Sequence, residues 1–270
     1  MKYKKGFTLI EISLFLALSG LLIVGVIAGT NRSISHQRYN NSVDSFVDSL
    51  KGLYSQVTYT QNSVATEAGR HGKAIYGKLI TFGEDDSDLS KVHIYTVIGK
   101  VLSSRDISDL GNISPLESLY WADADVFLTE NFETSIVNES SFNLDWGAVL
   151  ENGDNTPLKK TLLIVRSPLS GDIFTYVSDE ALPVHEGTEG FLKNYLPIFT
   201  NRPEEDYEAN LNQDLLSRVF KTEDLNFCID SGDRWAAGNF RRNVRIFAGG
   251  HNSTAVEVIL DNAEGNPCVE

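Results

Sequence analysis

The sequence lacks the short residue patterns that usually accompany catalysis or cofactor binding. Its five histidines are scattered, with no His-Glu-x-x-His or paired-cysteine metal spacing; they are His36, His71, His93, His185 and His251. It has no Gly-x-Ser-x-Gly turn, which would expose a nucleophilic serine after a strand, and no phosphate-binding glycine loop. We therefore expect neither an enzyme nor a bound cofactor.

Positive charge is also scarce. Lys and Arg number 23 against 37 Asp and Glu, which gives a formal net charge of −14. Such acidity excludes a general affinity for nucleic acid or anionic membranes, although a local basic patch could survive it. There is no internal repeat, low-complexity tract or proline-rich linker, and 270 residues, 41% of them hydrophobic, suffice for one large or two small globular units.

One long uncharged run lies near the N-terminus. Residues 12–29 would rise about 27 Å as a helix, close to the roughly 30 Å hydrocarbon core of a bilayer. Lys2, Lys4 and Lys5 precede the run, and Arg32 and Arg38 follow it. The lysine excess predicts a single-pass protein of the cytoplasmic membrane, with its N-terminus inside and the remaining chain outside.

Glu11 is unusual beside this run. A carboxylate within a membrane helix costs about 2.5–3.5 kcal/mol on insertion scales, so a specific partner is expected. Cleavage after Gly6 would make Phe7 a new N-terminus, four positions before Glu11. Its amine could pair with Glu11 of the same chain or of a neighbouring copy, and packing many copies side by side would satisfy every such charge. The charges therefore predict a filament subunit.

The segment Lys4-Lys5-Gly6-Phe7-Thr8-Leu9-Ile10-Glu11, followed by an apolar helix, resembles the class III leader of type IV pilins and pseudopilins. The resemblance covers residues 1–30 of the 270. It implies cleavage between Gly6 and Phe7 by the prepilin peptidase, N-methylation of Phe7, and assembly roles for Glu11 and Thr8. Many members have a proline in the middle of the membrane segment; this chain has Gly20, Gly25 and Gly29 there.

The family resemblance also implies a function and a set of partners. The chain would be a structural subunit, a minor pilin or pseudopilin, of a type IV pilus or a type II secretion-like filament. Its partners would be the prepilin peptidase, other pilin subunits and the inner-membrane assembly platform. The size of the part outside the membrane favours a minor subunit over a major one, since a major pilin must tile tightly.

Two simpler interpretations of the N-terminus remain open. It could be an ordinary secretory signal peptide, with Val26-x-Ala28 as the cleavage site, or a plain membrane anchor, and the chain would then be a secreted or anchored binding protein. Glu11 within the apolar region disfavours both. So does a helical pattern that continues past the site at Ala28.

The helical pattern continues beyond the apolar run with a different character. Apolar residues recur at steps of three and four among polar ones: Tyr39, Val43, Phe46, Val47, Leu50, Leu53, Tyr54 and Val57. One helix from residue 7 to about residue 60 would be about 80 Å long. We divide the chain into a leader (1–6), a membrane or filament-core helix (7–29), an amphipathic continuation (30–62) and a globular head (63–270).

The head is predicted to be rich in β-strands. Three pairs of apolar, β-branched segments flank turn sequences and predict hairpins: 74–82 with 92–101, 162–166 with 173–177, and 244–247 with 255–260. The signal weakens over 103–157 and 179–222, where 206–220 could be a short helix and the remainder reads as irregular insertions. Consecutive hairpins predict an antiparallel sheet, so the fold class is α+β with a long N-terminal helix packed on the head.

The only two cysteines are Cys228 and Cys268. An exported head permits a disulfide between them, which would contribute about 4 kcal/mol on the chain-entropy model; the alternative is two buried thiols. Pilins often clamp a C-terminal loop in this way, so the pair agrees with the resemblance. The segment from Cys228 to Trp235 is also similar to the C-terminal region of pseudopilins of the GspH/FimT type, without implying a role for any residue.

Two acidic pairs could ligate calcium, namely Asp123 with Asp125 and Asp230 with Asp233. Neither has the ligand count of a defined calcium loop, so solvated acidic turns are the simpler interpretation and no metal is expected.

A basic cluster contains Arg241, Arg242 and Arg245. It could grip phosphates in a minor pilin of a DNA-uptake system, which makes DNA an alternative partner. On a strand, Arg241 and Arg245 would share one face and Arg242 would lie on the other. The alternative, which we favour, is that the arginines neutralise nearby acids; candidates are Asp230, Asp233 and Glu257.

Overall fold

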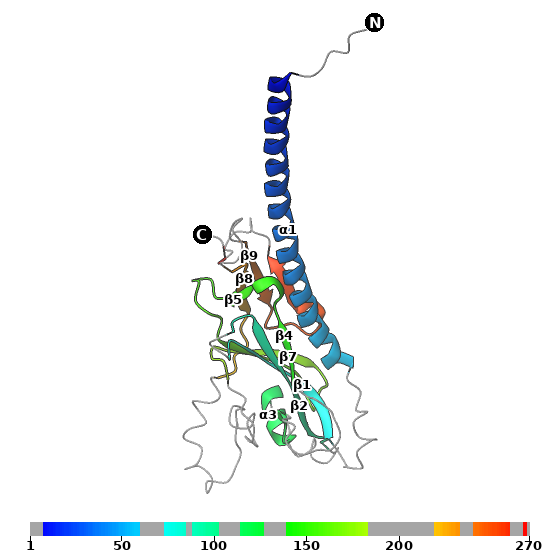
Figure 1. Ribbon diagram of the computed structural model, residues 1–270. Helices are drawn as coiled ribbons and strands as arrows, with labels where there is room; N and C mark the ends of the chain where they lie inside the picture. The colour runs from blue at the N-terminus through cyan, green and yellow to red at the C-terminus, as the bar shows by residue number, and fades with distance from the viewer. Residues whose placement is uncertain are drawn as a thin grey trace.

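The computed structural model shows one long helix and a head of antiparallel β-sheets, which confirms the α+β class (Figure 1). It describes residues 8–59, 73–84, 88–102, 114–126, 139–182, 219–232, 240–259 and 267–268. Gly6, Phe7, Asp233 and residues 206–218 of the expected short helix lie outside these ranges. The last two residues of that segment, Val219 and Phe220, are described and are not helical.

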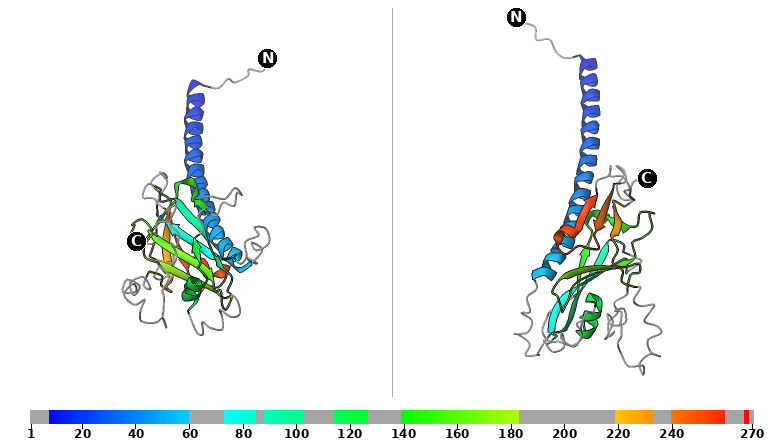
Figure 2. Two further views of the ribbon diagram at one scale, coloured as in Figure 1. Left: turned by 90° about the horizontal axis from the view of Figure 1, so that it is seen from below. Right: turned by 180° about the vertical axis from the view of Figure 1, so that it is seen from behind.

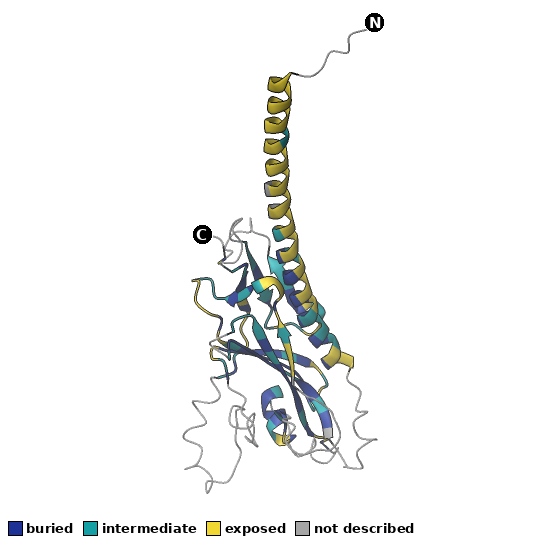
Figure 3. Ribbon diagram, in the orientation of Figure 1, coloured by how far each residue is buried: buried dark blue, intermediate teal, exposed yellow. Residues whose placement is uncertain are grey.

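Helix α1 spans Leu9–Tyr59, which agrees with the helix predicted over 7–60. Its first half stands clear of the head and its second half lies against it, as both views of Figure 2 show. Figure 3 shows the matching change in burial, from a first half that is almost wholly exposed in this view to a second half with buried residues along it. The amphipathic period of the second half therefore corresponds to docking on the head.

Sheet A contains six strands of the described chain in the order β3-β2-β1-β6-β7, with β4 paired to the same edge of β2 as β3. Their bounds are β1 Lys73–Phe82, β2 Lys91–Lys100, β3 Asp125–Val126, β4 Glu139–Asn143, β6 Lys160–Arg166 and β7 Ile173–Ser178. Strands β1 and β2 pair antiparallel, as do β6 and β7, so two of the predicted hairpins are confirmed.

Sheet B has the order β10-β9-β8-β5 within the described residues. Its strands are β5 Val149–Glu151, β8 Leu225–Asp230, β9 Arg241–Ile246 and β10 Val256–Ile259. The antiparallel pairing of β9 with β10 confirms the third hairpin. Strand β9 begins at Arg241 and not at 244 as predicted, because its polar first half pairs with β8 from Asp230 to Cys228.

The region 103–157, expected to be irregular, contains regular elements where it is described. These are α3 (Pro115–Trp121), β3, β4, the 3₁₀ turn η2 (Asp145–Gly147) and β5. Ser114 caps α3, since its hydroxyl accepts from the Glu117 N–H at 3.2 Å, and Pro115 occupies the first turn, where no N–H is needed. Between β4 and β5 the chain passes from sheet A to sheet B through η2, beside α1 (Figure 1).

Two hydrophobic cores hold the head together. The larger joins the buried stripe of α1 to one face of each sheet, and its largest fully buried side chains include Tyr39, Phe46, Tyr54, Phe82 and Phe227. The smaller lies on the opposite face of sheet A, under α3 and around Leu119. Each large apolar side chain of the stripe contributes about 1.5–3 kcal/mol by its burial, so α1 is part of the head's core and not a tether.

Candidate functional site

Thr8 and Glu11, the two expected assembly residues, contact each other at the first turn of α1. The Glu11 carboxylate accepts hydrogen bonds from the Thr8 backbone N–H at 2.9 Å and from the Thr8 hydroxyl at 3.0 Å. The Glu11 N–H in turn donates to Thr8 Oγ1 at 3.3 Å. This is a capping box, in which a Thr-x-x-Glu sequence satisfies free N–H groups at a helix start.

The capping box gives Glu11 local partners. The expectation of a charged partner for Glu11 did not include these contacts with Thr8, although the Thr-x-x-Glu spacing indicates a capping box. The position also suits a negative charge, because the N-terminus of a helix carries a partial positive charge. Gly6 and Phe7 lie outside the described residues, so pairing between Glu11 and the amine of Phe7 remains an expectation.

The segment after Glu11 presents apolar side chains to every side. Large ones are 50–85% exposed from Leu9 to Ile27, and Ile34 is still 45% exposed. Among the described residues, α1 is the one helix long and apolar enough to cross a membrane, and no part of its most apolar window is buried against the head. Within the part of the chain that the structure describes, this surface therefore has no protein partner.

Hydrogen bonds from three hydroxyl side chains of α1 fix its second half to the head. The Tyr39 hydroxyl donates to the Ile229 carbonyl of β8 at 2.7 Å, and the Ser42 hydroxyl donates to the Asp145 carbonyl of η2 at 3.1 Å. Near the C-terminal end, the Tyr54 hydroxyl lies 2.9 Å from Thr175 Oγ1 on β7. The helix is thus held by both sheets and by the turn between them.

Trp146 in η2 is placed unusually at this junction. It is 50% exposed, its backbone is left-handed (φ 62°), and the Arg38 guanidinium lies 4.5 Å from its ring centroid. A left-handed backbone costs a residue with a side chain about 1–2 kcal/mol, and an exposed cation–π contact returns about 0.5–1 kcal/mol. The contact with Arg38 does not by itself account for the strained, half-exposed placement. No sequence pattern pointed to Trp146.

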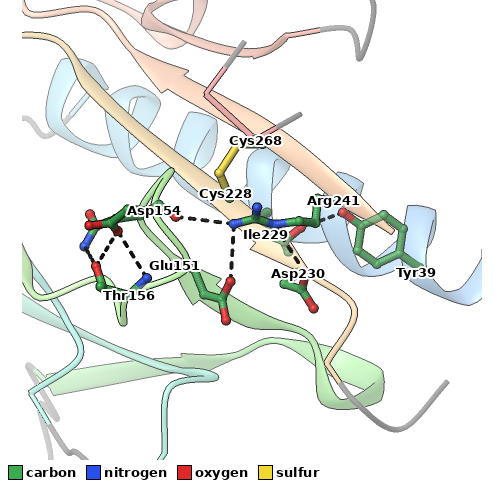
Figure 4. The surroundings of a disulfide bond; sticks show 10 residues. Tyr39, Glu151, Asp154, Thr156, Cys228, Ile229, Asp230, Arg241 and Cys268 are labelled. Atoms are coloured by element: carbon green, nitrogen blue, oxygen red, sulfur yellow. Dashed lines mark hydrogen bonds and ion pairs between the residues drawn. A yellow bond between two sulfur atoms is a disulfide. The ribbon is translucent and has the colours of Figure 1, made fainter. Parts of the chain in front are cut away.

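Cys228 and Cys268 form a disulfide, as expected, with their Cα atoms 5.7 Å apart (Figure 4). Cys228 lies at the centre of sheet B, where it faces Asn243 of β9 and Glu151 of β5 in register. Both cysteines are buried. The bond therefore ties the end of the chain to the face of sheet B that points away from α1.

Arg241 is paired with acids on that face. Its Nη2 lies 3.3 Å from Glu151 Oε2 and its Nε lies 3.4 Å from Asp230 Oδ2, while its side chain is 13% exposed (Figure 4). The neutralising role expected of Asp230 is thus confirmed, and Glu151 is an acid that the sequence did not single out. The nearest charged contacts of Arg241 are therefore two carboxylates of its own chain.

Arg245 and Arg242 point to different partners, as the alternation of a strand predicts. Arg245 Nε donates to Asp224 Oδ2 at 3.0 Å, and Glu257, the acid suggested by the sequence, lies opposite Arg245 in register. The Ala248 N–H and the Arg245 guanidinium hold the pKa of Asp224 below its usual value. Arg242 instead donates to the side chain of Asn40 on α1 at 3.4 Å. The three arginines do not converge on one surface.

The carboxylates considered for calcium have other contacts. Asp123 forms an ion pair with Lys100 at 3.1 Å, and Asp125 accepts from the Val126 N–H at 2.8 Å. Asp230 accepts from the Gly232 N–H at 2.7 Å in addition to its ion pair with Arg241. Within the described ranges, no three His, Cys, Asp or Glu side chains are grouped as a metal site requires.

Three features are candidates for a functional role: the exposed apolar helix with Thr8 and Glu11 at its start, the junction of α1 with the head, and the disulfide-bound face of sheet B.

No family model matches this chain, and neither a curated protein nor a solved structure similar to it was found.

Proposed function

We propose that this chain is a minor structural subunit of a type IV pilus-like or type II secretion-like filament. It is inserted as a single-pass precursor, cut between Gly6 and Phe7 by a prepilin peptidase, and methylated on the Phe7 amine. The inner-membrane assembly platform then moves it into a fibre with other pilin subunits. Helix α1 supplies assembly, and the head supplies recognition outside the membrane.

One observation carries this proposal. A single helix, Leu9–Tyr59, has one half that buries nothing against its own protein and another half that belongs to the head's core. A signal peptide removed after Ala28 would not need to continue without a break into a structural helix. A subunit that leaves the lipid and packs among copies of itself needs its apolar half and its head-bound half to form one continuous helix.

The head supports a minor and not a major role. It contains two sheets and the loops between them, and the C-terminus is clamped onto sheet B by the disulfide. A large and irregular head would obstruct tight tiling of identical subunits. This step rests on analogy at the level of the family.

The intact mass of the mature protein tests processing. We expect a chain that begins at Phe7, carries one methyl group and has lost two hydrogens to the disulfide. A chain that begins at Met1 contradicts processing, and one that begins at Gly29 identifies an ordinary signal peptide instead.

Substitution of Glu11 tests assembly. Glu11→Ala should leave insertion and processing intact but strongly reduce incorporation into filaments, because the carboxylate is proposed to meet the Phe7 amine of a neighbour. Ser13→Ala is the matched control, since the Ser13 hydroxyl only donates to the Ile10 carbonyl of its own helix at 2.9 Å. Normal incorporation of Glu11→Ala, with sheared filaments and membranes compared by immunoblot, would show that the charge pairing is wrong.

A further inference from the structure

The junction of α1 with the head carries a ring of aromatic and cationic side chains, which we call the junction collar: His36, Arg38, Trp146, Phe240 and Arg242. On one side of α1, Arg38 covers the ring of Trp146 at 4.5 Å. On the other, Phe240 contacts His36 edge-on at 4.9 Å, and Arg242 reaches Asn40. From these contacts we propose that the junction collar is a docking surface for lipid headgroups, which seats the head on the outer membrane-water boundary before assembly.

The position of the collar along α1 fits this occupant. A hydrocarbon core of about 30 Å takes roughly 20 helical residues, so a span that starts at Ile12 ends near Asn31. The backbone of Arg38 then lies about 10 Å farther along the axis, which is just beyond a headgroup layer roughly 5–7 Å thick. Side chains of a helix lean toward its N-terminus, which here is the membrane side. The Arg38 guanidinium and the indole beneath it therefore lie at headgroup depth.

The chemistry of the collar fits as well. Trp is the residue most typical of the membrane-water boundary, where its ring and its N–H find different surroundings. Among the described residues, neither Arg38 nor Arg242 has a carboxylate partner, whereas Arg241 and Arg245 on the far face of sheet B are both paired with acids. Unpaired guanidinium groups suit lipid phosphates. The one acid on the same turn, Asp145, is exposed and could reach water.

A lipid surface also gives Trp146 a contact in addition to Arg38, for a side chain that its own protein leaves 50% exposed. Its flanking residues Leu144 and Ala148 are buried, and Ser42 holds the Asp145 carbonyl, so the turn is fixed and the indole is presented outward. The inference rests on the proposed membrane span, and it adds that the head is oriented on the bilayer and not free to swing above it.

The test uses the full chain, one copy per lipid nanodisc, so that no second copy can cover the collar. Trp121→Phe and Trp235→Phe leave Trp146 as the sole tryptophan. We expect a nitroxide on the lipid headgroup to quench its emission, and iodide in the water to quench it severalfold less than it quenches a far reporter. That reporter is Tyr59→Trp in a chain whose three natural tryptophans are Phe, because Tyr59 is 80% exposed. It lies about 30 Å farther along the helix than Arg38.

The charge of the collar is tested in the same discs. Adding phosphatidylglycerol to phosphatidylcholine should increase the headgroup quenching of Trp146, and Arg38→Gln with Arg242→Gln should abolish this increase. Lys51→Gln, on the same helix but well below the collar, should leave it unchanged.

Two results would overturn the inference. One is equal iodide access at the two reporters without nitroxide quenching. The other is protection of Trp146 that appears only when two copies share a disc, which would assign the surface to a second copy. Co-elution of chain and disc separates these results from failure of the span itself, since a chain that does not enter discs contradicts the proposed function instead.

Discussion

At the scale of single residues, two tyrosine hydroxyls hold α1 on the sheets from inside the core. Thr175 donates its hydroxyl hydrogen to the Gly250 carbonyl at 3.1 Å, so Tyr54 acts as the donor to Thr175. Tyr54→Phe should lower the free energy of unfolding by about 1 kcal/mol, the usual worth of a buried hydrogen bond. Urea denaturation of the full chain in detergent measures this. Tyr59→Phe, at an exposed hydroxyl, is the control and should change nothing.

The same tyrosine makes stability depend on pH in the alkaline range. Burial raises the pKa of Tyr54 to about 12 from the usual tyrosine value of 10.0. A raised pKa in the folded chain means that the contribution is complete below about pH 10 and is lost as the pH rises toward 12. Tyr54→Phe should therefore flatten the fall in stability over this range. Burial also raises the pKa of Tyr176 to about 12, so part of the fall should persist. An unchanged slope in Tyr54→Phe would show that its hydroxyl is not buried.

A contact between single residues could be predicted from the sequence where two opposite charges lie close together along the chain. The pairing of Arg241 with Asp230 followed from opposite charges close together in the sequence. The contact of Arg38 with Trp146 could not be predicted, because it joins α1 to a turn that is distant in sequence and left-handed at a residue with a side chain. Nothing in a list of residues distinguishes such a tryptophan from an ordinary core residue.

At the scale of elements, long periodic segments were predictable and short strands were not. Helix α1 and three hairpins have enough residues for their period to show. Strands β3 and β5 are two and three residues long, too short for a pattern, and the five residues of β4 include a single apolar one, Phe142. Strand β8 was not predicted, although Leu225, Phe227 and Ile229 alternate with Asn226, Cys228 and Asp230.

The division of the strands into two sheets was also beyond the sequence. The crossing from sheet A to sheet B takes place at η2, whose geometry depends on a positive φ at Trp146 and Gly147 and on the Ser42 hydrogen bond from α1. Both features depend on tertiary structure. The local sequence, Leu144-Asp145-Trp146-Gly147-Ala148, is compatible with many loop conformations.

Sheet B depends on the disulfide at its centre. The bond joins residues 40 apart in sequence and removes about 4 kcal/mol of chain entropy from the unfolded state. Cys228→Ser with Cys268→Ser should lower the free energy of unfolding by roughly 2–5 kcal/mol, the usual range for a native disulfide. Reduction of the unmodified chain is the matched comparison, because it opens the same bond without introducing hydroxyls. Equal stability of the reduced and oxidised chains in denaturant titrations would contradict this account.

At the scale of the whole molecule, α1 belongs to two surroundings that meet near residue 35. Up to Ile34 its large apolar residues are exposed; from Tyr39 onward its apolar stripe is in the core shared by both sheets. The boundary between anchor and head is therefore not the boundary between helix and strands. A domain division drawn at the end of α1 would cut through the core.

This arrangement predicts opposite results for two truncations. Removal of residues 1–30 deletes apolar surface that the head does not use, so the remaining chain should be soluble, folded and monomeric. Removal of residues 1–59 deletes a core face that includes Phe46, Leu50 and Tyr54, all of them at most 2% exposed. Replacing one such side chain by alanine typically costs about 2–5 kcal/mol, while a whole domain has only about 5–15 kcal/mol, so the shorter chain should not fold. Thermal unfolding and size-exclusion chromatography distinguish the outcomes, with Phe46→Ala in the chain that lacks only residues 1–30 as an intermediate case. A cooperative transition in the chain that lacks residues 1–59 would show that the sheets form a core without α1.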